Sequence, residues 1–211
     1  MAMPSATSQT RMELINLRKK LVLAQRGKDL LQEKMDALVM EFFYIAREVT
    51  YAKKVAFKSL EEAHRLLTVC LGVNGTLETL QHMREVRKDF KVEISSKLIM
   101  GVETPLVTVH AREKKVTERG YGLYTSNPLL DKVAEKFEET LKYLCKLAEL
   151  ESSLLAIAEE LEKTKRRVNA LEHVIIPEVR ETIRMIEMKL GEIERDNFVR
   201  LKRMKTLRER R

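Results

Sequence analysis

The stretch that decides the fold runs from Leu14 to Leu66 and reads LINLRKKLVLAQRGKDLLQEKMDALVMEFFYIAREVTYAKKVAFKSLEEAHRL. Apolar residues recur in it at every third and then fourth position, with a mean step of about 3.5 residues, which is the repeat of a coiled coil. Fourteen of the sixteen positions in this stripe are apolar, and Lys28 and Ser59 are the exceptions. Because so narrow a stripe needs a partner helix of similar length, the sequence predicts a rod. The stripe alone spans roughly 80 Å at ~1.5 Å per residue.

The first long helix has recognisable ends. Thr10 and Glu13 have the spacing of a capping box, in which a hydroxyl and a carboxylate satisfy the free amides at a helix start. No glycine or proline occurs between Lys28 and Leu71. The glycines that follow provide turn chemistry, so we expect this helix to end between residues 70 and 75.

A second long helix is expected to begin at Asn127-Pro128, with asparagine as the N-cap and proline at the first helical position. Apolar residues continue from Val168 to Met204 with a mean step of about 3.6 residues, which predicts a straighter helix than the first. Pro177 lies inside this pattern. Because proline removes one backbone hydrogen bond, we expect a kink there.

Residues 72–126 differ in composition and contain five of the seven glycines. Two short runs that favour β-structure, 92–94 and 106–109, flank Met100-Gly101 and predict a hairpin. Residues 77–88 are expected to form a short helix. This insert connects the two long helices, so the helices are expected to be antiparallel.

The predicted fold is therefore mainly α, with two very long antiparallel helices forming a coiled coil and a small insert that contains a β-hairpin. We divide the chain into an N-terminal long helix (1–71), the insert (72–126) and a C-terminal long helix (127–211), which together make one elongated structural unit. Alanine, glutamate, lysine, leucine and arginine make up about half of the residues, which is typical of long helices and coiled coils.

The sequence offers little support for an enzyme. It contains no glycine-rich phosphate loop, no HExxH motif and no cluster of cysteine and histidine with metal-ligand spacing. We therefore expect no catalytic residue, no cofactor and no metal. Cys70 and Cys145 are far apart and do not form a CxxC motif, so we interpret both as reduced thiols of a cytosolic protein. No apolar run is long enough to span a membrane.

Positive charge is concentrated at the C-terminal end. The chain carries a formal charge of +8, and residues 195–211 account for +6 of it. This segment has three interpretations: a solvated helix end favoured by the helix dipole, a site for nucleic-acid phosphates, or a contact with an acidic protein collar. Gly27 also has two interpretations, a tolerated weak point in the helix or a place where another chain approaches closely.

Several motifs resemble those of the D subunit of V-type and A-type rotary ATPases. They are KTKRRVNALEHVIIP at 163–177, LGEIER at 190–195, FVRLKR at 198–203, IMGVETP at 99–105 and TRMEL at 10–14. The first of these blocks is specific, and the resemblance covers almost the whole chain. It implies a non-catalytic central rotor shaft that transmits torque between the catalytic hexamer and the ion-translocating membrane ring.

The same resemblance implies the partners. They are the catalytic A and non-catalytic B subunits of the hexamer, the small F subunit of the central stalk and the funnel-shaped subunit that links to the membrane ring. The shaft would be cytoplasmic and peripheral to the membrane, and it would bind no nucleic acid. The alternative is a basic coiled-coil protein that binds nucleic acid or an anionic membrane, which would require the positive charge to form a stripe.

Two sets of residues are our candidates for partner contacts. The first set, the basic quartet, is expected to face acidic loops of the hexamer and consists of Arg195, Arg200, Lys202 and Arg203. The second set, the hairpin patch, is expected to contact a partner subunit or a supporting helix, because a two-stranded hairpin is too small to be stable alone. It consists of Val92, Ile94, Val107 and Val109.

Overall fold

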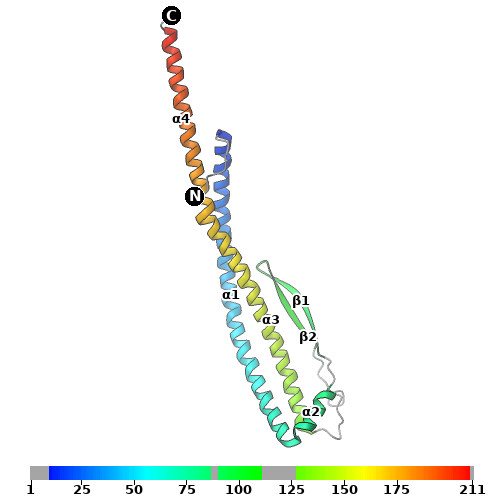
Figure 1. Ribbon diagram of the computed structural model, residues 1–211. Helices are drawn as coiled ribbons and strands as arrows, with labels where there is room; N and C mark the ends of the chain where they lie inside the picture. Colours follow the sequence, from blue (N-terminus) through cyan, green and yellow to red (C-terminus); the bar gives the residue numbers. More distant parts are fainter. Residues whose placement is uncertain (1–9, 87–89, 111–126, 210–211) are drawn as a thin grey trace. The chain divides into compact units, whose positions relative to one another are not determined.

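The computed structural model of the protein describes residues 10–86, 90–110 and 127–209. Its elements, in chain order, are α1 (Arg11–Asn74), α2 (Thr76–Glu85), β1 (Lys91–Ile99), β2 (Val102–His110), α3 (Pro128–Ala170), the π-helical turn η2 (Leu171–Ile175) and α4 (Ile176–Glu209) (Figure 1). The predicted fold class is confirmed: long helices lie on either side of a small antiparallel hairpin in the sequence. The short helix α2 begins and ends close to its expected position, and residues 87–89 and 111–126 of the insert lie outside the described residues.

Two compact units make up the chain. The terminal unit comprises Met1–Asp36 and Leu161–Arg211, and the hairpin unit comprises Ala37–Glu160. None of the sixteen positions of the predicted stripe is exposed, so the periodicity identified the buried face of α1 in both units. None of the helices in the described ranges combines the length and the hydropathy needed to cross a membrane.

Both predicted helix starts are present. The Glu13 amide donates to Thr10 Oγ1 at 3.3 Å, which is the hydroxyl half of the capping box. The Leu129 amide donates to Asn127 Oδ1 at 3.2 Å, so Asn127 caps α3. Asn127 Nδ2 also donates to Asn74 Oδ1 at 2.9 Å and thereby ties the start of α3 to the end of α1. Gly75 then adopts φ +80° and ψ +157°, a backbone conformation that glycine adopts readily because it has no Cβ.

In the terminal unit, α1 and α4 pack as an antiparallel pair around a small apolar core. This core consists of Leu17, Val179, Ile183 and Ile186, with Leu14, Leu21 and Leu190 packed against it. Arg11 pairs with Glu194 at 2.6 Å, and Arg18 pairs with Glu187 at 2.7 Å. The second pair lies seven residues later in α1 and seven residues earlier in α4. One heptad step therefore carries the antiparallel register from one ion pair to the next.

The helix containing Pro177 accommodates the proline through a wide turn. The Ile176 amide donates to the Leu171 carbonyl, a spacing of five residues that makes η2 a π turn. This departure from α-helical hydrogen bonding lies immediately before the proline, whose ring would crowd the carbonyl of His173 in a regular α-helix. Lys28 is the charged position of the apolar stripe. Its Nζ lies 3.9 Å from Oε1 of Glu172, a residue of η2.

In the hairpin unit, α1 lies beside α3 and the hairpin runs along α3 (Figure 1). One apolar core is formed by Cys70, Leu130 and Val133, with Leu66, Leu67, Val86, Leu129 and Phe137 packed against it. Burial raises the pKa of the Cys70 thiol, which disfavours the thiolate and fits the interpretation of Cys70 as a structural thiol.

A buried hydroxyl pair links α1 to α3. Ser59 Oγ and Thr140 Oγ1 are 2.9 Å apart, and Thr140 Oγ1 also donates to the Lys136 carbonyl at 2.7 Å. Thr140 therefore accepts the hydrogen bond from Ser59. This hydrogen-bonded pair explains how a serine occupies a position of the predicted apolar stripe.

Replacing Thr140 by valine is expected to lower the free energy of unfolding by about 1–2 kcal/mol, because the buried Ser59 hydroxyl loses its acceptor. Urea denaturation measures the effect. The double variant Ser59→Ala/Thr140→Val should cost less than the sum of the two single variants, since it leaves no unpaired hydroxyl. If the changes in the free energy of unfolding of the two single variants add fully, the hydrogen bond between Ser59 and Thr140 does not contribute to stability.

Candidate partner-binding surfaces

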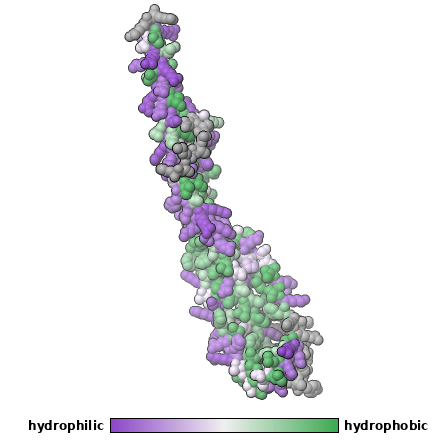
Figure 2. Space-filling view, in the orientation of Figure 1, coloured by the Kyte–Doolittle hydropathy of each residue, from purple (hydrophilic) through white to green (hydrophobic). Residues whose placement is uncertain are grey.

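The C-terminal segment of α4 is solvent-exposed along its whole described length. Every residue from Glu192 to Glu209 is exposed. The described part of α1 begins at Arg11, which pairs with Glu194, so α4 continues for about four turns beyond this contact. Figure 2 shows hydrophilic residues predominating along this segment.

The structure places all four residues of the basic quartet on this segment. At about 100° per residue, Arg195 and Lys202 share one face, whereas Arg200 and Arg203 share a neighbouring one. The four charges therefore cover roughly half of the helix circumference and do not form one row. Such a distribution presents positive charge to partners on more than one side.

Large apolar side chains are exposed between these charges, a feature that our sequence reasoning missed. Phe198 is 70% exposed, and Leu201 and Met204 are each 68% exposed. The helical period predicts that Leu201 and Met204 belong to the packed stripe. They have no described helix opposite them, so this segment offers apolar as well as cationic contacts to a partner.

The hairpin patch is a single surface formed by two directly opposed pairs. Val92 lies opposite Val109, and Ile94 lies opposite Val107. Residues two apart on a strand share a face, so all four side chains lie on the same side of the hairpin. Val107 and Val109 are half-buried, whereas Ile94 is 74% exposed.

A buried carboxylate holds β2 against α3. The Val107 amide donates to Glu149 Oε2 at 3.3 Å, and Lys146 Nζ donates to Glu149 Oε1 at 2.8 Å. Glu149 is only 9% exposed. The sequence held no signal for this role, because one glutamate among many on a long helix looks like part of a solvated face.

Replacing Glu149 by alanine is expected to release the hairpin from α3 and leave the helices intact. The Val107 amide should exchange with solvent roughly 10-fold faster or more, because it loses a hydrogen bond to a charged acceptor worth about 1.5–3 kcal/mol. Amide exchange measured by NMR tests this. Glu149→Gln is the matched control, since it keeps an acceptor oxygen and should preserve most of the protection; equal exchange in both variants would contradict the assignment.

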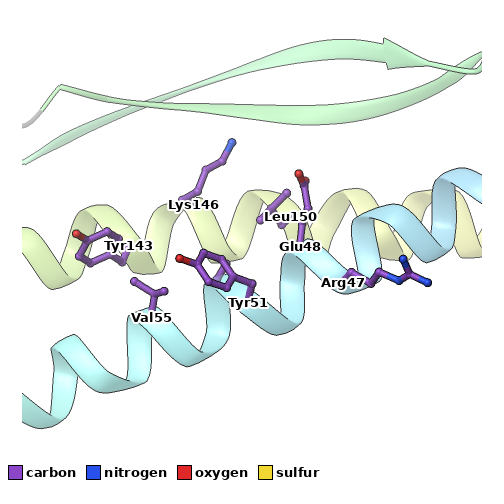
Figure 3. Close-up of a pocket in the computed structure, with 8 residues that line it drawn as sticks. Arg47, Glu48, Tyr51, Val55, Tyr143, Lys146 and Leu150 are labelled. Atoms are coloured by element: carbon purple, nitrogen blue, oxygen red, sulfur yellow. The ribbon is translucent and has the colours of Figure 1, made fainter.

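A groove lies between α1 and α3 on the side of the hairpin unit drawn in Figure 3. It encloses about 490 Å³ and is lined by Arg47, Glu48, Tyr51, Ala52, Val55, Tyr143, Lys146 and Leu150. Glu48 and Lys146 extend toward the hairpin, and Tyr51 and Tyr143 border the space between the helices (Figure 3). Close to this groove, a hydrogen bond with Glu48 raises the pKa of Tyr44. Figure 2 shows apolar residues gathered over this unit.

Comparison with known proteins gives the family. A family model described as the D subunit of ATP synthase matches residues 13–206. This chain belongs to the ATP synthase D-subunit family. Relatives named as D subunits of A-type ATP synthases include that of Pyrococcus abyssi, which is 45% identical over 96% of this chain and 94% of its own length. The relative in Methanobrevibacter smithii is 42% identical over 93% of this chain and 85% of its own length.

Membership in the D-subunit family makes the chain a subunit of a rotary ATPase, and its long helices fit a coiled-coil stalk. The motif block of residues 163–177 spans the end of α3, the π turn and the start of α4. In the described ranges, no group of three or more histidine, cysteine, aspartate or glutamate side chains could hold a metal ion.

Proposed function

We propose that this chain is the central rotor shaft of the rotary ATPase and transmits torque between the A/B hexamer and the membrane ring. In this role the chain is not itself catalytic, and the nucleotide sites belong to the hexamer. The observation that carries the proposal is the antiparallel pairing of α1 with α4, beyond which α4 extends as an exposed, positively charged helix. Continuous helices provide the stiffness and length that a torque-bearing shaft needs.

The basic quartet is proposed to face acidic loops of the hexamer. A shaft that turns inside a ring needs contacts that can be exchanged, and interlocking apolar surfaces would stall it. Exposed charged side chains form such contacts, because each ion pair contributes little alone.

The remaining partners are proposed to bind elsewhere on the chain. The hairpin patch contacts a partner subunit. The part of the shaft nearer the membrane ring binds the F subunit and the funnel-shaped subunit. Association with the membrane is indirect and cytoplasmic. The proposal also requires residues 1–71 and 127–211 to act as one rigid antiparallel pair, with residues 72–126 as the insert.

Reconstitution tests the proposed function. Tagged chain mixed with purified A and B subunits should co-elute with them as a stoichiometric complex that hydrolyses ATP. Mobility-shift and liposome-binding assays at physiological salt address the alternative of a basic coiled coil that binds nucleic acid or anionic membranes. Tight binding in those assays, without any assembly with A and B, would overturn the proposal.

Replacing Ile94 by aspartate is expected to weaken binding of the partner subunit at the hairpin by roughly 10-fold or more, because a charge would enter an apolar contact. Since Ile94 is exposed in the free chain, the variant should keep its wild-type thermal unfolding temperature. Co-purification with the F subunit and the funnel-shaped subunit, together with ATPase turnover, measures the effect. Wild-type binding and turnover would remove the hairpin patch from the proposal.

A further inference from the structure

The two edges of the hairpin differ in what covers them. The outer edge of β2 lies against α3, where the Val107 amide donates to Glu149. In the described part of the chain, β1 pairs with β2 alone, and every β1 residue from Lys91 to Leu98 is exposed. The outer edge of β1 is therefore an open strand edge.

The register shows which backbone groups of β1 point outward. In an antiparallel pair, the residues of every second pair direct their amide and carbonyl groups away from the partner strand. Because the Val107 amide points to α3, the pair that it forms with Ile94 is of this outward kind. The alternation then extends to the other residues of the same parity in β1, which are Val92, Ser96 and Leu98.

Two further observations agree with this assignment of outward and inward residues in β1. Met100 and Gly101 form a two-residue turn with φ values of +50° and +81°. Such a turn is closed by an inward, hydrogen-bonded pair, here Ile99 with Val102. Pro105, which has no amide hydrogen, lies opposite Ser96 in an outward pair, where the ladder loses nothing.

The side chains of β1 also suit the binding of a further strand at this edge. Three of the four residues with outward backbone groups, Val92, Ile94 and Leu98, carry apolar side chains on one face, with Ile94 74% and Leu98 68% exposed. The opposite face of β1 carries Lys91, Glu93 and Lys97. Glu93 lies 3.1 Å from His110 Nε2, and the two lysines make this face positively charged.

We propose that the outer edge of β1 binds an extended segment of a partner subunit as a third strand of the sheet. The segment would carry apolar residues at alternate positions, next to Val92, Ile94 and Leu98, and acidic residues on its other face, next to Lys91 and Lys97. Backbone hydrogen bonds would provide affinity, and the two faces would provide register and specificity. This inference rests on the proposed function of the hairpin as a partner contact and gives that contact its chemistry.

Amide hydrogen exchange in the free chain and in the purified ATPase complex tests the proposal. The chain exchanges in each state, is quenched and dissolved in an aprotic solvent, and is then examined residue by residue by NMR. The inward amides of Glu93, Ser95 and Lys97 should be protected in both states. The outward amides of Ile94 and Ser96 should gain about 100-fold protection or more in the complex alone.

The outcomes separate this inference from the proposed function. If the chain is absent from the complex, the proposed function fails. If the chain is present and the Ile94 and Ser96 amides exchange as fast as in the free chain, the third strand is overturned and the proposed function stands. Protection that rises with the concentration of the isolated chain, together with a dimer mass in light scattering, would identify a second copy as the occupant and overturn the inference.

A matched pair of variants provides an independent test. Ser96→Pro removes the outward amide, whereas Ser96→Ala changes the side chain and keeps the amide. The proline variant should bind its partner subunits roughly 10-fold more weakly and the alanine variant as the wild type does, with the inward amides still protected in both. Equal binding by the two variants, with the hairpin intact, would contradict the proposal. If Ser96→Pro also loses its inward protection, the exchange experiment on the unmodified chain decides.

Discussion

Changing the whole basic quartet to glutamine is expected to weaken docking of the chain in the A/B hexamer by roughly 10- to 100-fold. Each exposed ion pair contributes about 0.2–1 kcal/mol, so four such contacts together account for a change of this size. The quartet lies within residues 195–211, which account for +6 of the net charge of +8, and all four of its residues are exposed. Loss of these four charges should leave folding unchanged, because none of the four side chains is buried.

The salt dependence of binding identifies the cause. The affinity of the wild-type chain should fall as ionic strength rises, and the affinity of the quartet variant should fall less steeply, because screening acts on exposed charges. A control variant removes the same number of charges elsewhere, by changing Lys20, Lys54, Lys58 and Lys132 to glutamine. Binding to immobilised hexamer should distinguish the two variants at low salt. Equal losses in both would show that net charge matters and the position of the quartet does not.

Replacing Leu38 by alanine is expected to lower the free energy of unfolding by about 2–5 kcal/mol. Leu38 is fully buried and is among the largest side chains with no exposed surface. Its truncation removes apolar contacts and leaves a cavity that a narrow two-helix interface can only partly close. Denaturation by urea, followed by circular dichroism, measures the change.

Leu30→Ala is the matched control for this variant. Leu30 lies in the same helix, eight residues earlier, and is 66% exposed. The same chemical change there should alter stability by no more than about 0.5 kcal/mol. A similar loss of unfolding free energy in both variants would mean that burial along the apolar stripe does not determine stability.

The helical framework could be predicted because its causes are local. A 3.5-residue repeat fixes which face of α1 is buried, and the caps at Thr10 and Asn127 depend on side chains within three residues of the amides they bind. The hairpin followed from two short β-favouring runs and the Met100-Gly101 turn. That turn also fixes the register, which brings the four residues of the hairpin patch together.

Features that depend on distant segments could not be predicted. Glu149 bonds to a backbone amide 42 residues away, and its sequence neighbours do not reveal that contact. The groove beside Tyr51 and Tyr143 arises only when α1 and α3 lie together. Periodicity also overestimated the packing of α4, because Leu201 and Met204 continue an apolar stripe for which the described chain provides no partner helix.

Observation of rotation tests the central claim of a rotor shaft most directly. A single probe is attached to a cysteine introduced at Glu78, an exposed position in α2, with Cys145 replaced by serine so that labelling is specific. The hexamer is immobilised through its A and B subunits, and the probe is followed while ATP is hydrolysed. The proposed function predicts continuous rotation of the probe in one direction, at a rate that rises with ATP concentration. A probe that stays fixed while the same complexes hydrolyse ATP would contradict it.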